Sequence, residues 1–457
     1  MLGPSGIGLL GTITTSVDLV RVFFLFGIDA ATVKKIAQCK CDMVAASRVY
    51  KTSLRIGILL GLASTIIFFL SSFYLSDQLL NDASKYWWFI AGGSSLLLTP
   101  ALSIQIAFLQ GINKVREIAL CQIITSISAS ILNILLVIAF GILGAALSIS
   151  VFTVMSYVIH RIFVQKFLVD VTGDLWKTFF ENLKNTIRSG SAFAINGIWL
   201  ALSNWLNIFF LNQTSRSGQS AFEIGLLSAA TIFGNYYLNI LISAIAADFY
   251  PRLIQAADKK ERFNSLLDHQ IRLCMALGIP VIAIAIITAP LMLEFFYSKE
   301  FVGAQSVMRL LLVGMSVRFV VFPLTFALSA YGNSKEIATN ELLMGGITIG
   351  LSWIFISNFG LIGIGVASVC SNSIILSGLI IYNYLKKVRI KRSTLGIVYA
   401  SMAFMIASTF LILNSSLVVN YIGIFALSGL ILFHLMLFKK DANISLKNMI
   451  KLKKLFK

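Results

Sequence analysis

The sequence contains few charged residues. Asp, Glu, Lys and Arg make up 12% of its 457 residues, about half of the roughly 25% that is usual in soluble proteins. Hydrophobic residues reach 58%, and the mean hydropathy is +0.87. One water-soluble core cannot bury this much apolar surface, which excludes a soluble enzyme, a secreted disulfide scaffold and a nucleic-acid-binding domain. We therefore expect an all-α polytopic membrane protein.

Motifs that would carry chemistry are missing as well. The five cysteines follow neither disulfide nor zinc-site spacing. The three histidines lie near the ends of apolar runs or in a charged loop, and no phosphate-binding loop is present. We expect free thiols, no metal, no cofactor and no enzyme activity on this chain.

Apolar runs divide the chain into candidate membrane spans, each of which needs about 20 residues. Thirteen runs meet this length, and short polar or charged loops separate them. We predict spans at 7–30, 54–74, 86–109, 117–138, 140–160, 189–211, 223–247, 273–296, 304–330, 340–357, 360–383, 395–413 and 418–437.

The basic residues alternate between loops in step with these spans. Of the 37 Lys and Arg residues, 31 fall on one side, three on the other and three within spans. Because cytoplasmic loops carry the excess of positive charge, the C-terminus is predicted to be cytoplasmic. Thirteen spans then place Met1 outside, with no signal peptide before it. We expect that a first helix is missing because the start codon was assigned too late.

Short segments recur at offsets of 217 to 221 residues. Ile7-Gly8-Leu9-Leu10 returns as Ile224-Gly225-Leu226-Leu227, and Phe140-Gly141 returns as Phe359-Gly360. The offset covers an even number of spans, so the two copies share one orientation, as in parallel transporter repeats. We predict two six-helix bundles followed by two additional helices.

This repeat sets the predicted domain boundaries. Residues 166–188 have the spacing of an amphipathic helix, which would lie on the membrane surface or pack on neighbouring loops. The predicted parts are an N-terminal bundle 1–165, this cytoplasmic linker, a C-terminal bundle 189–390, two further spans within 391–438 and a basic tail 439–457.

Three charged residues fall near the middle of predicted spans: Asp18, Arg21 and Arg318. Charges at this depth are costly and usually face a cavity or a partner. Asp18 and Arg21 are spaced i, i+3, which would let them pair on one helix face. Alternatively, they line a polar cavity in which Arg21 and Arg318 bind an anion.

Further polar residues are candidates for binding or ion coupling. Asn235 occupies the repeat position of Asp18, and Asn196, Asn204 and Asn207 would bind sugar hydroxyls or neighbouring helices. Asp248 and Arg252 are spaced for a structural ion pair. The candidates for substrate binding are Arg21, Arg318, Asn196, Asn204, Asn207 and Asn235, and those for ion coupling are Asp18, Asp29, Asp248 and Glu341.

Several segments carry a family resemblance. Leu2-Gly3-Pro4-Ser5-Gly6-Ile7-Gly8, Phe249-Tyr250-Pro251-Arg252-Leu253 and the turn at 293–301 resemble those of Wzx-type flippases for lipid-linked polysaccharides. These flippases belong to the multidrug/oligosaccharidyl-lipid/polysaccharide exporter superfamily, and the similarity covers residues 2–390. Members of the family have one helix ahead of the first motif.

The resemblance implies a MATE-like fold and a substrate. The protein would move an undecaprenyl-diphosphate-linked oligosaccharide, such as an O-antigen unit, across the cell inner membrane by alternating access. Its partners would be this substrate, membrane lipids and a glycan polymerase complex, but no nucleic acid. The alternatives are an ion-coupled multidrug antiporter, whose cavity should be acidic, and a membrane glycosyltransferase, which should have a large acidic outer loop.

Overall fold

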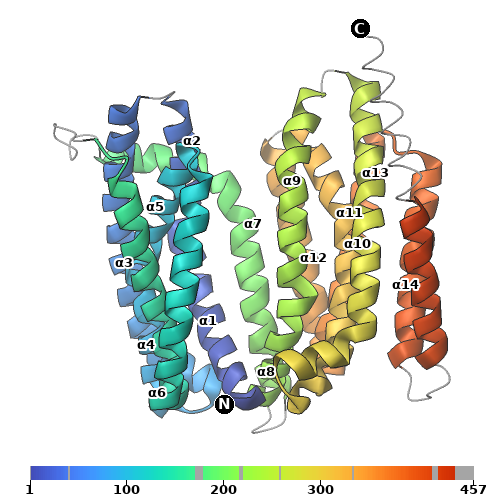
Figure 1. Ribbon diagram of the computed structural model, residues 1–457, viewed down its shortest axis with the longest axis horizontal. Coiled ribbons are helices and arrows are strands. Elements are labelled where there is room, and N and C mark those ends of the chain that lie inside the picture. Colours follow the sequence, from blue (N-terminus) through green and yellow to red (C-terminus); the bar gives the residue numbers. More distant parts are fainter. Residues whose placement is uncertain are drawn as a thin grey trace. The chain divides into compact units, whose positions relative to one another are not determined.

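The computed structural model describes residues 2–39, 42–169, 179–215, 220–256, 259–331, 334–386, 388–413 and 420–437 (Figure 1). Every regular element in these ranges is a helix, which confirms the predicted all-α class. The chain divides into two compact units, Met1–Gly225 and Leu226–Lys457, and each is described by itself. The predicted tail 439–457 lies outside the described residues, as does the middle of the predicted linker.

The first unit contains long helices joined by short turns. A short helical turn, η1, precedes α4, and another, η2, joins α4 to α5; α8 runs across the boundary between the units. The elements are α1 (Gly3–Leu25), α2 (Ile28–Gln38), α3 (Met43–Leu80), η1 (Ala83–Lys85), α4 (Tyr86–Gly93), η2 (Ser94–Leu97), α5 (Thr99–Gly111), α6 (Val115–Gln165), α7 (Phe179–Thr214) and α8 (Ser220–Thr231).

The second unit repeats this pattern of long helices. Its α10 contains two prolines, Pro280 and Pro290, and continues as a helix through both. The elements are η3 (Ile232–Tyr236), α9 (Tyr237–Gln255), α10 (Lys260–Phe296), η4 (Lys299–Ala304), α11 (Gln305–Tyr331), α12 (Ser334–Phe359), α13 (Leu361–Leu385), α14 (Arg392–Leu413) and a last helix at Asn420–Leu437.

Eleven helical stretches in the described part are long and apolar enough to cross a membrane. One of them, α6, contains two predicted spans, because Gly141 leaves helical geometry with φ 57° and ψ −127° and the chain reverses there. The predicted span 189–211 lies within α7. With these two additions, the thirteen predicted spans fall on helical segments of this multi-pass membrane protein, and the span at 86–109 is divided between α4 and α5 by η2.

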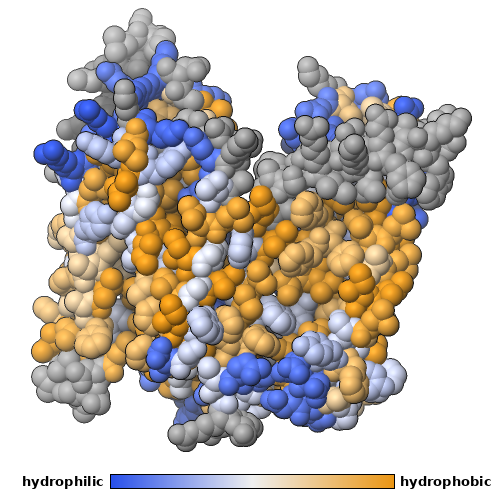
Figure 2. Space-filling view, turned by 180° about the vertical axis from the view of Figure 1, so that it is seen from behind, coloured by the Kyte–Doolittle hydropathy of each residue, from blue (hydrophilic) through white to orange (hydrophobic). Residues whose placement is uncertain are grey.

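The surface is that of a protein surrounded by lipid. On the face drawn in Figure 2, hydrophobic side chains cover the middle of each unit and hydrophilic ones gather toward its ends. Large apolar side chains are strongly exposed, among them Leu70 at 80% and Phe295 at 82%. Such exposure is unfavourable in water but suits a hydrocarbon environment.

The first predicted span is shorter than expected. The span at 7–30 is interrupted after Leu25, because Phe26 (φ 38°) and Gly27 (φ 73°) adopt the left-handed conformation. A left-handed residue ends the helical hydrogen-bond series, and α2 then starts at Ile28. Asp29 consequently belongs to the first turn of α2, where its Oδ1 accepts the backbone N–H of Ala30 at 2.8 Å.

Two helical hairpins carry the repeated Phe-Gly motif. Gly141 of α6 has φ 57° and ψ −127°, and Gly360, between α12 and α13, has φ 56° and ψ −135°. Only glycine adopts this conformation readily. Three residues after each turn, a second glycine packs against the opposite arm. A Cβ on Gly144 would lie 1.9 Å from the Leu136 carbonyl oxygen, and a Cβ on Gly363 would lie 2.1 Å from the Phe355 carbonyl oxygen.

Helix α7 packs within the first unit. It contacts α1, α2 and α3, and the Trp205 indole donates a hydrogen bond to Ser16 Oγ of α1 at 3.2 Å. Asn212 Nδ2 donates to the Gln78 carbonyl at 2.9 Å. The sequence assigned this helix to the C-terminal bundle 189–390, and that boundary stays a prediction.

The additional helix α14 is attached to the second unit by a polar cluster. The carboxylate of Asp268 in α10 is buried; it lies 3.6 Å from Arg272 Nε and accepts the Lys391 backbone N–H at 3.1 Å. Arg272 Nε in turn donates to Thr394 Oγ1 at 2.9 Å. These contacts fix the start of α14, which packs on α10 and α11.

Candidate functional site

An ion pair occupies the C-terminal half of α1. Arg21 Nε lies 3.1 Å from Asp18 Oδ1, and the two side chains keep 38% and 56% of their surface exposed. Asp18 is 15 residues from Gly3, or about 22 Å along the helix axis, which is within a hydrocarbon core about 30 Å thick but past its centre. The i, i+3 pair, one of the two interpretations of the sequence, therefore forms, with Asp18 exposed and Arg21 half-buried.

A second pair of opposite charges lies in the second unit. Arg318, in the middle of α11, is half-buried, and Glu341 of α12 lies within electrostatic range of it. Neither candidate arginine is thus an isolated cation, and each compact unit holds one arginine beside one carboxylate. An anion would have to share each arginine with that carboxylate or displace it.

The asparagines of α7 differ in their surroundings. Asn204 is exposed, whereas Asn207 has a buried Oδ1 that accepts no hydrogen bond from the residues the structure describes. A buried amide oxygen without a donor is costly, which makes Asn207 the stronger candidate for a ligand contact. Asn212, which the sequence analysis did not select, donates its Nδ2 to Gln78, but its Oδ1 is likewise buried and accepts no hydrogen bond from the described residues. The side chain of Asn196 lies outside the described residues.

Asn235 lies in an unusual turn. The segment η3, Ile232–Tyr236, is a π-helical turn between α8 and α9, and Asn235 is half-buried within it. Such turns inside helices are frequent at functional sites. The repeat predicted a polar site at Asn235. It did not predict the π-helical turn, because such a turn has no characteristic side-chain pattern. The side chain of Asp248, further along α9, lies outside the described residues.

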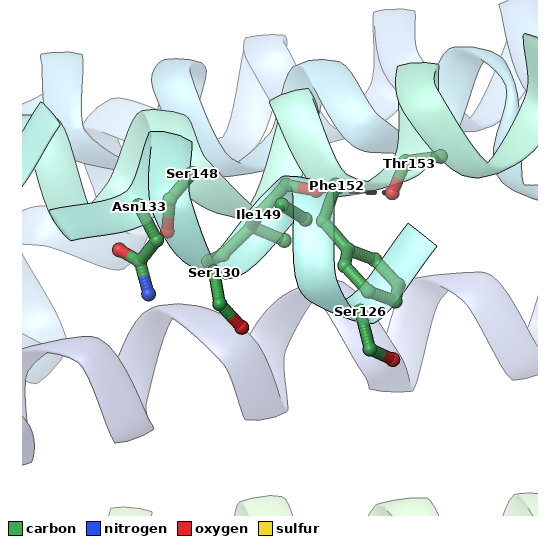
Figure 3. A pocket seen from close by; sticks show the side chains of 8 residues that line it. Ser126, Ser130, Asn133, Ser148, Ile149, Phe152 and Thr153 are labelled. Carbon is green, nitrogen blue, oxygen red and sulfur yellow. Dashed lines mark hydrogen bonds between the residues drawn. The ribbon is translucent and has the colours of Figure 1, made fainter. Parts of the chain in front are cut away.

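A polar pocket lies within the α6 hairpin, and the sequence analysis missed it. The hollow measures about 390 Å³. Figure 3 shows three polar side chains on one arm facing the same hollow as residues from the other arm. Its lining is Ser126, Ala129, Ser130, Asn133, Ser148, Ile149, Phe152 and Thr153. The i, i+4, i+7 spacing of Ser126, Ser130 and Asn133 was the available signal, since it puts them on one helix face.

The pocket and the ion pair lie at similar depths. A Cβ on Gly92 would meet both Ile13 of α1 and Ile149 of α6, so these two residues are level with each other. From this level, α1 and the second arm of α6 (142–165) run in the same direction. The chain that follows Ile13 reaches Ile36, the arm that follows Ile149 reaches Val164, and these two residues share one core cluster. Arg21 is eight residues beyond Ile13, and Thr153 is four residues beyond Ile149. At 1.5 Å per residue, Arg21 therefore lies about 6 Å further along the shared helix direction than Thr153.

The cysteines in the described part of the chain are free thiols: Cys39, Cys121, Cys274 and Cys370. Cys39 lies at the end of α2, where burial and the nearby Asp42 carboxylate raise the pKa of its thiol. A raised pKa disfavours the reactive thiolate. Among the residues with described positions, no group of three His, Cys, Asp or Glu side chains gathers around a common point.

Comparison with protein families identifies the chain. A model of the family described as "Polysaccharide biosynthesis protein" matches residues 1–257, which is more than half of the sequence. The chain belongs to the polysaccharide biosynthesis protein family. A second family model, that of the lipid II flippase MurJ, matches residues 221–433. Comparison with curated protein sequences gives no match.

Solved structures agree on the fold of this family member. An inward-facing multidrug resistance MATE transporter of the MOP superfamily has a TM-score of 0.68 at 17% identity, over 84% of this chain and 91% of its own. The lipid II flippase MurJ, inward closed, has a TM-score of 0.67 at 14% identity, over 96% and 97%. A MOP superfamily transporter from Pyrococcus furiosus, reported with reversed polarity of its binding pocket, has a TM-score of 0.59 at 16% identity, over 84% and 93%.

The resemblance to flippases of the multidrug/oligosaccharidyl-lipid/polysaccharide exporter superfamily is confirmed by these matches. The MATE-like membrane fold is confirmed as well. Flippase-type transport is the activity that the two family models support. Neither they nor the fold favour enzyme chemistry.

Proposed function

We propose that this protein moves an undecaprenyl-diphosphate-linked oligosaccharide, an O-antigen or related surface glycan unit, across the cell inner membrane. The observation that carries the proposal is the polysaccharide biosynthesis family match over residues 1–257. In this proposal the C-terminus is cytoplasmic, and a glycan polymerase complex receives the translocated unit.

The ion pair of α1 supplies a binding mode for the diphosphate. Asp18 contacts Arg21 through Nε, and no hydrogen bond of the terminal Arg21 amino groups to the described part of the chain is found. Those amino groups suit bidentate binding of a phosphate. Without substrate, Asp18 compensates the charge of Arg21, because an unpaired charge in the membrane is unfavourable. With substrate, the diphosphate takes over that role.

The second half offers a comparable pair, and Arg318 with Glu341 is our candidate for a further phosphate contact. A phosphate bound at Arg318 would displace Glu341 in the way that one bound at Arg21 displaces Asp18. Asp18 and Glu341 then become the ion-coupling candidates, since each loses its arginine when the substrate binds. Asp29 is a weaker candidate for ion coupling, because its Oδ1 accepts a backbone N–H in α2. For Asp248, the ion-coupling role stays a prediction.

The proposal is tested by complementing a deletion strain and measuring surface glycan. We expect Arg21→Ala to lower glycan display about tenfold or more, because the diphosphate loses a charge-assisted bidentate partner. Arg21→Lys should keep partial activity, since the charge remains but the fork-shaped donor set is lost. Arg318→Ala should lower display as well.

Arg161→Ala is the matched control, because Arg161 is exposed near the end of α6, where it donates to the Tyr157 hydroxyl at 3.1 Å. It should leave the glycan unchanged at equal protein levels in the membrane. Normal display with both Arg21→Ala and Arg318→Ala would overturn the diphosphate-binding role.

An ion-coupled multidrug antiporter is the second candidate. The observation that favours it is the MATE likeness, together with the greater exposure of Asp18 than of Arg21, since an exposed carboxylate suits a cationic drug. Drug susceptibility of the same deletion strain separates the two functions. Increased susceptibility with normal surface glycan would replace the flippase by the antiporter.

A further inference from the structure

The pocket in the α6 hairpin has a lining without charge. Five of its eight side chains carry a hydroxyl or an amide: Ser126, Ser130, Asn133, Ser148 and Thr153. Hydroxyls and amides both donate and accept hydrogen bonds. The lining offers no Arg or Lys for a phosphate and no carboxylate for a metal ion. The chemistry of this lining therefore matches an uncharged ligand rich in hydroxyl groups.

Three of these polar side chains have no partner in the described part of the chain. Thr153 Oγ1 and Ser148 Oγ donate to carbonyls of their own helix, at 3.0 and 2.7 Å. In contrast, Ser126, Ser130 and Asn133 are exposed, and the described residues offer them no hydrogen bond. Polar groups at membrane depth are unfavourable without partners, so this face is suited to water or to a ligand.

The size and remaining walls of the pocket fit a sugar. About 390 Å³ lies within the roughly 300–1,000 Å³ range of small-molecule sites. Phe152 and Ile149 complete the lining (Figure 3), and an exposed aromatic ring offers an apolar surface to the C–H face of a sugar ring. Apolar walls with a few placed polar groups are the usual composition of a ligand site.

We infer that the α6 pocket binds an uncharged sugar of the lipid-linked glycan while Arg21 binds its diphosphate. This inference rests on the proposed flippase function and adds a subsite to it. The depth relation supports the pairing, because Arg21 lies only about 6 Å beyond Thr153 along the helix direction. A sugar next to the diphosphate would then sit beside the α6 arms.

Cysteine labelling tests the subsite directly. Ser130→Cys is placed in a variant whose five native cysteines are replaced by serine, and membrane vesicles are treated with a hydrophilic, membrane-impermeant maleimide. One set of vesicles comes from cells that make the lipid-linked glycan, and the other from cells that lack the first glycosyltransferase. We expect labelling in glycan-free vesicles and at least threefold slower labelling in glycan-containing ones. Equal rates, or no labelling in either set, would overturn the subsite.

A second variant covers the case in which the cysteine-free protein fails to reach the membrane. Ser130→Ile with Ser148→Ala, made in the native sequence, should lower glycan display about tenfold, as expected when hydrogen bonds to the ligand are lost. Ser128→Ala is the matched control, because Ser128 donates to the Ile124 carbonyl at 2.7 Å and does not line the pocket. Unchanged display in the double variant would reject the subsite.

The two proposals fail differently. If Arg21→Ala abolishes glycan display while Ser130→Cys shows no protection and the double variant is normal, the flippase function stands and the sugar subsite does not. If the deletion strain itself displays normal glycan, the flippase function is rejected. The subsite is then rejected with it, since it has no lipid-linked glycan to bind.

Discussion

The hairpin of α6 and the hairpin of α12 and α13 share a backbone but not a lining. Their turn glycines differ by only 1° in φ and 8° in ψ, and each has a second glycine packed on the opposite arm. At the offset of 219 residues between the two hairpins, Ser130 corresponds to Ile349 and Ser148 to Ala367, whereas Asn133 and Thr153 have polar counterparts in Ser352 and Asn372. The repeat has kept the turn geometry in both halves and has changed which positions of the arms are polar.

Packing offers a reason for this difference. In the second hairpin, Ser368 lies at the position of Ile149, and a Cβ on Gly314 of α11 would lie 2.3 Å from its hydroxyl. The side chain at this position is therefore held against α11, which packs closely on α13. In the first hairpin the corresponding Ile149 forms part of the pocket wall. Backbone geometry is thus shared, while side-chain lining has diverged.

The largest effect is expected from substituting the packed glycines. Gly144→Ala and Gly363→Ala would each place a methyl group about 2 Å from a backbone carbonyl oxygen, which rigid arms cannot accommodate. We expect each to destabilise its hairpin by about 3 kcal/mol or more, measured as a fall in detergent-solubilised thermal stability. Gly346→Ala, at a position with nothing within 4 Å, is the control. A large loss of thermal stability in only one of the two variants would show that the two hairpins are not packed alike.

A smaller loss of stability, equal in the two hairpins, is expected from substituting the turn glycines. Gly141→Ala and Gly360→Ala meet no atom within 4 Å, so the cost comes from the backbone conformation alone. Conformations of this kind cost about 1–3 kcal/mol for a non-glycine residue. The same thermal measurement should give two similar decreases, and a difference larger than about 1 kcal/mol would contradict a shared turn geometry.

The turns η1, before α4, and η4, before α11, sharpen the comparison further. The Ser84 hydroxyl and the Lys85 ammonium hold the pKa of Asp82 below its usual range, and Asp82 caps η1. In the second half, Ser298 precedes η4 without a side-chain cap hydrogen bond.

A depressed carboxylate pKa stabilises the turn above the unfolded pKa of about 4, and this is lost as the pH falls through the folded value. We expect amide hydrogen exchange at Ser84, corrected for the intrinsic pH dependence, to accelerate below pH 4, with little change at Phe301. The effect should be the smallest of the three, because more than a third of each side chain, Asp82 and Lys85, is exposed to solvent screening. Equal acceleration of exchange at both turns would indicate global unfolding. In the Asp82→Asn variant, exchange at Ser84 should no longer depend on pH more strongly than exchange at Phe301.

Much of the fold could be predicted because its signals are local. Apolar run length gave the spans, and the repeated Phe-Gly motif located both turns. Spacing alone offered the Asp18–Arg21 pair as one of two interpretations, since i, i+3 residues are neighbours on any helix. These features depend on one helix at a time, or on a motif that occurs twice.

What could not be predicted depends on contacts between helices. Ser126, Ser130 and Asn133 share a helix face, but only the position of the opposite arm turns that face into a pocket. The sequence does not show that packing buries the side-chain oxygens of both Asn207 and Asn212 without a donor, or that the Asn212 amide nitrogen reaches the Gln78 carbonyl. The π turn at Asn235 depends on a shift in backbone hydrogen bonding that has no side-chain signature.

The matching hairpin turns also provide a practical marker of topology. Gly141 and Gly360 are separated by an even number of predicted crossings, so both tips are predicted to emerge on the same side of the bilayer. An epitope inserted at either tip would be reached by the same antibody from the same compartment. One insertion would therefore orient the whole chain, and the other would verify it independently.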